Sequence, residues 1–228
     1  MWGPMPDFDI ASSLNTIAVA LVPAMLGIIL HEVAHGWAAA RLGDPTARSM
    51  GRLTLNPLPH IDPVGLLCFV LTSLSGAFVF GWAKPVPVDP RYFRNPVKGM
   101  MAVALAGPLT NFLLAIAFAL LLALVLHTVP MAFLESWGGT EYLLKSLQVG
   151  VLINLSLAWL NLLPIPPLDG SKVVAYFLPR EWAWRYLRVE RWGFVILIVL
   201  IVAGVLNSIL VPLIWGSAEG LLALFGLG

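Results

Sequence analysis

The chain has 228 residues, of which 59% are hydrophobic and only 11% are charged, and its formal net charge is +1 at pH 7. Soluble domains carry roughly a quarter charged residues, so this composition excludes an ordinary soluble domain and indicates a membrane protein. The near-neutral charge argues against nucleic acid as a partner, because phosphate binding requires clustered Lys and Arg.

Long apolar segments dominate the chain. The N-terminal stretch MWGPMPDFDI contains two Asp and no basic residue, which is not the pattern of a cleaved signal peptide. A spanning helix needs about 20 mainly apolar residues. The segments that approach or exceed this length are Ile10–Ala40, Met100–Leu126, Leu147–Leu163 and Phe194–Trp215. The sequence therefore predicts an all-α polytopic membrane protein, residues 1–228 forming a single domain with about four spanning helices.

A fifth apolar run, Val64–Phe80, is shorter, contains the single cysteine Cys68, and is interrupted by TSLSG at residues 72–76. Lys and Arg accumulate in cytoplasmic loops, and this rule decides how to place the run. If it crosses the membrane, basic loops lie on both sides; if it does not, twelve of the thirteen basic residues share one face. We therefore expect a re-entrant hairpin on the cytoplasmic side, with both termini outside.

Two proline-limited stretches flank the fifth run, ARSMGRLTLNP at 47–57 and AKPVPVDP at 83–90. Both look extended, and we expect them to pair as a small membrane-associated β element. Pro85 and Pro87 have no N–H group, which restricts the second stretch to an edge position.

Three ionisable residues arrive together at the end of the first apolar segment: His31, Glu32 and His35. On a helix the two histidines lie on one face, one turn apart, where they can bind one Zn²⁺. In the H-E-x-x-H arrangement the glutamate serves as general base. This composition produces the motif by chance only about 0.002 times. Because ionisable groups within a membrane are costly, the pattern favours a metal site over structural histidines.

A catalytic zinc usually has a third protein ligand. Asp169 lies in NLLPIPPLDGSK at 161–172, whose prolines indicate a broken, extended segment at the depth of the two histidines. Gly170 permits a tight turn or a close approach there. His60 and Asp62 remain alternatives, although they also suit a turn and helix cap, and His127 lies beyond the second span on the opposite face. We expect Asp169 to complete the site.

Three motifs in this order resemble the site-2 protease family of intramembrane zinc metalloproteases, in its compact form without a PDZ or CBS domain. They are H-E-x-x-H at His31–His35, G-P-x-x-N at Gly107, Pro108 and Asn111, and N-x-x-P-x-P-x-L-D-G at Asn161–Gly170. The similarity covers a catalytic core at about 14–178, and a C-terminal helix at about 192–215 follows it.

The resemblance implies that His31, His35 and Asp169 bind one Zn²⁺ and that Glu32 is the catalytic base. It also implies that Asn161 lies near the scissile peptide, where it stabilises the oxyanion or orients the substrate strand. Asn111 follows the Gly107–Pro108 pair, at which we expect a break in the second span. It has two interpretations, a buried amide that ties helices together or a substrate contact, and the first is favoured. By family analogy, the edges at 49–55 and 83–90 would pair with an unwound substrate.

We therefore expect an intramembrane zinc metalloprotease of the prokaryotic plasma membrane, with its active site towards the cytoplasm. Its partners would be the lipid bilayer and single-span membrane proteins, which it would cut near the cytoplasmic side. The alternative is a membrane metallohydrolase acting on lipidated or small amphiphilic substrates. A metal carrier is a third interpretation, but it gives no reason for Glu32 beside the two ligands.

Overall fold

The computed structural model describes residues 10–75 and 82–227, which are mostly helical and contain no β-strand. Its α-helices, in chain order, are α1 (Ile10–Arg41), α2 (Thr46–Ser49), α3 (Pro63–Ser75), α4 (Pro96–Thr128), α5 (Met131–Ser136), α6 (Thr140–Leu162), α7 (Asp169–Phe177), α8 (Arg180–Leu187), α9 (Glu190–Val202) and α10 (Val205–Leu224). Short 3₁₀ turns occupy Leu58–His60 and Pro90–Tyr92. Within the described residues, α1 from Leu14 onward, α4, α6 and α10 are long and apolar enough to cross a membrane. The prediction of an all-α polytopic membrane protein is confirmed.

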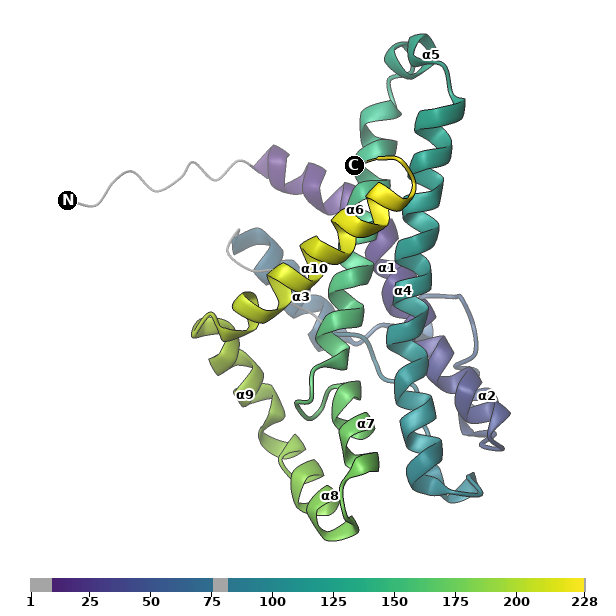
Figure 1. Cartoon of the computed structure of the whole chain (residues 1–228), viewed down its shortest axis with the longest axis vertical. Coiled ribbons are helices and arrows are strands. Elements are labelled where there is room, and N and C mark those ends of the chain that lie inside the picture. The colour runs from purple at the N-terminus through teal and green to yellow at the C-terminus, as the bar shows by residue number, and fades with distance from the viewer. Residues whose placement is uncertain (1–9, 76–81, 228) are drawn as a thin grey trace, which may run out of the picture.

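Helices α1, α4 and α6 form the centre of the bundle, with α7 packed on α4 and α10 packed on α6 (Figure 1). Small residues allow the close approach of α4 and α6. Ala115 and Ala119 are fully buried, and a Cβ atom on Gly150 would lie 2.6 Å from the ring of Phe118. Such small-residue contacts are typical of helix packing inside a membrane, where lipid tails are as apolar as the side chains.

The two ends of the bundle differ in charge. Figure 1 shows α5 at one end and α2, α8 and the start of α4 at the other. The sequence around α2, α8 and the start of α4 carries most of the basic residues, whereas residues 127–146, around α5 and the first turns of α6, carry only Lys145. Both described ends of the chain, the start of α1 and the end of α10, lie away from the basic end (Figure 1).

Helix α4 runs without interruption through Gly107 and Pro108. The break that the G-P pair predicted in the second span is therefore wrong. A proline inside a membrane helix is tolerated because neighbouring helices and local adjustments compensate for the missing N–H group. Gly107 has a different use, described below.

The fourth predicted span, Phe194–Trp215, is not one helix. Helix α9 ends at Val202 and α10 begins at Val205, with Gly204 between them in the left-handed conformation at φ 73°. Glycine adopts this conformation without the steric penalty of a Cβ atom. Because the residues on both sides of Gly204 are equally apolar, hydropathy alone does not mark the bend.

The predicted hairpin and β element are not confirmed. Helix α3 covers the first part of Val64–Phe80, and residues 76–81 lie outside the described residues, so the re-entrant path stays a prediction. The described residues form one isolated antiparallel bridge, which pairs Ala83 with Ile61 rather than with a residue of 47–57. The next N–H on the same edge, that of Val86, donates to the side chain of Glu32 instead of extending a ladder.

Candidate metal centre

The two histidines of α1 and the first residue of α7 meet inside the bundle. The Nε2 atoms of His31 and His35 are 3.0 Å apart. Oδ2 of Asp169 lies 3.2 Å from Nε2 of His31 and 3.1 Å from Nε2 of His35. Their side chains are only 9%, 12% and 10% exposed, in the order His31, His35, Asp169. The predicted ligand set is thus brought together from segments far apart in the sequence.

The outer nitrogen of each ring fixes the ring's orientation. Nδ1 of His31 lies 2.6 Å from Oδ1 of Asn111, and Nδ1 of His35 lies 2.7 Å from the carbonyl oxygen of Val103. Since both oxygens only accept, each neutral ring carries its proton on Nδ1. Each Nε2 then presents a lone pair towards the carboxylate of Asp169.

This donor set fits a zinc ion. Three acceptor atoms at such short separations repel one another unless a cation or a proton lies between them. Tetrahedral Zn²⁺ with bonds of about 2.0–2.1 Å places its ligand atoms about 3.3 Å apart, close to the observed spacing of 3.0–3.2 Å. Two imidazoles and a carboxylate also match the ligand types of catalytic zinc, which leave a fourth position open.

Gly107 gives the two rings their space. A Cβ atom built on Gly107 would lie 2.6 Å from Cε1 and Nε2 of His31 and 2.6 Å from Cε1 of His35. Any side chain at this position of α4 would therefore push the imidazoles apart. The glycine of the G-P-x-x-N motif serves the metal site through close packing rather than through a bend.

Asn111 connects the site to the centre of the bundle. Its side chain is fully buried, and its Nδ2 donates to the carbonyl oxygen of Gly27 at 3.1 Å and to Oδ1 of Asn154 at 3.0 Å. Together with the bond from His31, these contacts join α1, α4 and α6 through one amide. They support the favoured interpretation of Asn111 as a helix-tying residue.

Asp169 is presented by the proline-rich connection between α6 and α7. Gly170 allows this connection to fold tightly, because a Cβ atom there would lie 2.1 Å from the carbonyl oxygen of Leu162. Nζ of Lys172 lies 3.5 Å from Oδ1 of Asp169. Its positive charge favours the ionised carboxylate that a metal ligand requires.

Glu32 is held differently from the ligands. Its Oε2 accepts a hydrogen bond of 2.7 Å from the backbone N–H of Val86. Val86 lies in a non-helical connection that is itself fixed at Lys84, whose N–H donates to the carbonyl oxygen of His60 at 2.8 Å and whose carbonyl oxygen accepts from Arg52 at 2.6 Å. Oε1 of Glu32 accepts no hydrogen bond from the part of the chain that the structure describes.

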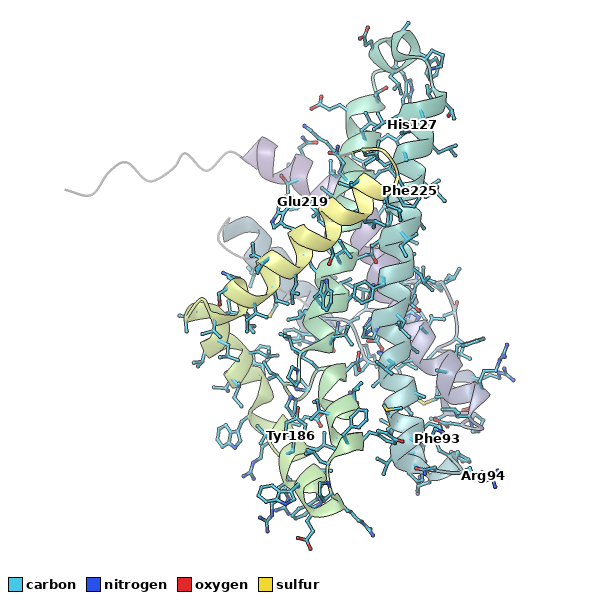
Figure 2. All side chains as sticks on the ribbon, viewed as in Figure 1. Phe93, Arg94, His127, Tyr186, Glu219 and Phe225 are labelled. Atoms are coloured by element: carbon cyan, nitrogen blue, oxygen red, sulfur yellow. The ribbon has the colours of Figure 1, made fainter. Side chains whose placement is uncertain are left out.

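The alternative third ligands lie elsewhere. Oδ1 of Asp62 accepts from the N–H groups of Val64 and Gly65, both at 2.9 Å, and so caps α3. His60 is buried, with Nε2 at 3.0 Å from the carbonyl oxygen of Thr54. His127 lies near the far end of α4 (Figure 2), and the twenty residues that separate it from Gly107 correspond to about 30 Å of helix.

Asn161 lies near the end of α6, and its Nδ2 donates to the carbonyl oxygen of Leu157 at 2.9 Å. Its catalytic role stays a prediction.

Four groups at the site were not found from the sequence: Asn154, Lys172, the carbonyl of Val103 and the N–H of Val86. Asn154 had a signal, an amide side chain within an apolar segment. Lys172 also had one, since it follows Asp169 by three residues on a helix, where its Nζ lies 3.5 Å from Oδ1. The two backbone groups had none, because any residue can supply them.

Comparison with known proteins agrees with this geometry. A model of the Peptidase family M50 matches residues 19–204. The chain is 32% identical over 213 residues to "Putative zinc metalloprotease YwhC" of Bacillus subtilis, covering 93% of each chain. It is 34% identical to "Putative zinc metalloprotease Rip2" of Mycolicibacterium smegmatis, over 86% of this chain and 71% of that protein. It is also 34% identical to "Putative zinc metalloprotease MJ0611" of Methanocaldococcus jannaschii, over 75% of this chain and 76% of that protein.

No solved structure matches the chain. The family match covers most of the chain and includes His31, His35 and Asp169. The chain therefore belongs to Peptidase family M50, the site-2 protease family, and is an intramembrane zinc metalloprotease.

Proposed function

We propose that this peptidase hydrolyses peptide bonds within the membrane-spanning segments of single-span proteins, near the cytoplasmic face of a prokaryotic plasma membrane. The observation that carries the proposal is the convergence of His31, His35 and Asp169 on one point inside a membrane bundle, with Glu32 next to them on α1. The orientation rests on charge, since the basic end of the bundle is the end expected on the cytoplasmic side.

Some residues of the chain would hold the metal ion, and another would transfer a proton. His31, His35 and Asp169 would hold the ion, with Asn111 and Val103 fixing the two rings. Bound there, Zn²⁺ would supply Lewis-acid assistance to a water molecule and to the scissile carbonyl. Oε1 of Glu32 would accept a proton from the attacking water and return it to the leaving amine. Asn161 would contact the substrate near the scissile bond.

The proposal is tested with the purified full chain, reconstituted in vesicles with candidate single-span substrates. We expect zinc-dependent release of a fragment from the cytoplasmic side, which a chelator abolishes and added Zn²⁺ restores. Glu32→Gln should keep one zinc per chain and lose cleavage, because an amide cannot accept the proton. Cleavage by Glu32→Gln at the wild-type rate would contradict the assigned base.

The same vesicles distinguish the other two interpretations. Release of lipidated tails or hydrolysis of small amphiphiles, with intact spanning segments, would identify a metallohydrolase of a different substrate class. Zinc flux across the bilayer without any cleavage would identify a carrier. In both cases the membrane-spanning peptide would be excluded as the substrate.

A further inference from the structure

The basic end of the bundle carries a short helix of unusual composition. In and beside α8, the tryptophans are turned outward: Trp182 is 62% exposed, Trp184 is 56% exposed, and Trp192 at the start of α9 is 58% exposed. Four exposed arginines alternate with them, at positions 180, 185, 188 and 191. We call residues 180–192 the Arg–Trp segment. Its four Arg and two Glu give it a net charge of +2.

Arg188 stacks on a tryptophan ring, and Arg185 lies over another at a longer distance. The guanidinium of Arg188 lies 3.4 Å from the ring centre of Trp184, and that of Arg185 lies 5.7 Å from the ring centre of Trp182. Among the described residues, neither guanidinium forms an ion pair with a carboxylate or donates a side-chain hydrogen bond. A stacked guanidinium is held in plane while its edge can still donate to a phosphate in bidentate fashion.

We propose that the Arg–Trp segment is a binding site for the phosphate headgroups of anionic phospholipids. Exposed tryptophans prefer the headgroup level of a membrane, and basic residues beside a spanning helix attract anionic lipids. Phe177, which is 74% exposed just before the segment, adds apolar surface for the acyl region. A membrane lipid can contact the tryptophan rings with its apolar part and the arginines with its phosphate. A free anion can contact only the arginines.

The segment is attached to the connection that presents Asp169. The hydroxyl of Tyr186, on α8 (Figure 2), donates to the carbonyl oxygen of Pro164 at 2.6 Å. On α9, a Cβ atom at Gly193 would lie 2.1 Å from the carbonyl oxygen of Pro166, so α9 also presses on the same connection. Headgroup binding therefore stabilises the 163–168 connection and, through it, the position of Asp169.

A matched pair of double variants tests the site. Arg185→Gln with Arg188→Gln removes the two arginines that lie over tryptophan rings. Arg48→Gln with Arg94→Gln removes two exposed arginines, one on α2 and one just before α4, at the same end of the bundle (Figure 1). The full chain is titrated in neutral detergent micelles with phosphatidylglycerol, and retained lipids are counted by native mass spectrometry. All proteins carry Glu32→Gln, so that the result does not depend on proteolysis.

We expect the first double variant to bind phosphatidylglycerol about thirtyfold more weakly, because it lacks two basic groups that each contribute about 1 kcal/mol at a membrane surface. The control should bind like the parent protein. Equal losses in both variants, or no loss in either, would overturn the proposal. Inorganic phosphate in place of the lipid should not raise the midpoint of thermal unfolding, and an equal rise would exclude a lipid as the natural occupant.

Tyr186→Phe tests the connection to Asp169. This variant keeps the lipid-binding residues but loses the hydrogen bond to Pro164. Phosphatidylglycerol binding should persist while the rise in the thermal midpoint that it causes becomes smaller. An unchanged rise would show that headgroup binding is not transmitted through Tyr186. The coupling to activity rests on the proposed function, whereas the lipid count and the thermal midpoint do not.

Discussion

Two of the candidate metal ligands and the candidate base are neighbours on α1, but different parts of the molecule hold them. His31 and His35 are fixed by Asn111 and Val103 of α4, a long helix at the centre of the bundle. Glu32 is fixed by the N–H of Val86, in the non-helical connection before α4. The position of the metal site therefore depends on helix packing, whereas the position of Glu32 depends on a non-helical connection. Substitutions should therefore separate zinc binding from the chemical step.

Removing a ligand should have the largest effect. Asp169→Ala takes away the carboxylate that faces both imidazoles, so zinc content should fall from one per chain to background and cleavage should cease. Zinc per chain is measured by elemental analysis of the purified protein. Asp62→Asn is the matched control, because Asp62 caps α3. If Asp62→Asn lost zinc while Asp169→Ala retained it, the assignment of Asp169 as the third ligand would be wrong.

Filling the space beside the rings comes next. Gly107→Ala places a methyl group within 2.6 Å of both imidazoles, so the rings must move. A displacement of about 1 Å at a catalytic site can reduce the rate about a hundredfold, and we expect a reduction of at least this size together with weaker zinc binding. Gly216→Ala, on α10 with nothing within 4 Å, should leave both unchanged. Wild-type kinetics in Gly107→Ala would show that the two imidazole rings can accommodate a methyl group beside them, which would contradict the close contact described above.

Loss of the amide behind His31 should weaken the metal site without abolishing it. Groups that orient a metal ligand contribute about 10–100-fold to metal affinity, and we expect a loss in this range for Asn111→Ala, measured by competition with a chelator. Asn161→Ala is the useful contrast, since it should retain zinc affinity and lower kcat. If both variants lost zinc equally, the two asparagines would not have the separate roles assigned to them.

The loop that holds Glu32 provides the mildest test. Val86→Pro removes the N–H group and keeps an extended backbone, whereas Val86→Ala retains the N–H group. A hydrogen bond to a charged group is worth about 1.5–3 kcal/mol, so kcat should fall about tenfold to a hundredfold in Val86→Pro with zinc content unchanged. The same fall in Val86→Ala would attribute the effect to the buried side chain.

Much of the fold follows from hydropathy, and the exceptions have local causes. Helix α6 begins at Thr140 rather than Leu147, because its first turns carry Glu141 and Lys145 and extend beyond the apolar run. The bend at Gly204 and the continuity of α4 through Pro108 were missed for a shared reason. Apolar length measures how much chain can lie in a membrane, but not whether its backbone is straight.

The convergence of the three candidate ligands was predictable because ionisable side chains have few other uses within an apolar segment. His31, His35 and Asp169 lie within hydrogen-bonding distance, as the motifs indicated. The supporting backbone groups were not predictable, because any residue at position 103 would supply the same carbonyl group as Val103. The expected sheet is not confirmed, and the sequence did not show that the N–H of Val86 donates to Glu32 rather than to a neighbouring strand.

The amide of Asn111 also has a consequence for biosynthesis. Its contacts require α1, α4 and α6, and the last ligand arrives only with α7. A chain still emerging from the ribosome has inserted its H-E-x-x-H helix long before these partners exist. It cannot capture zinc in this arrangement or attack its neighbours until most of its length has been translated. The order of the helices thus delays the onset of proteolysis until α7 has been made.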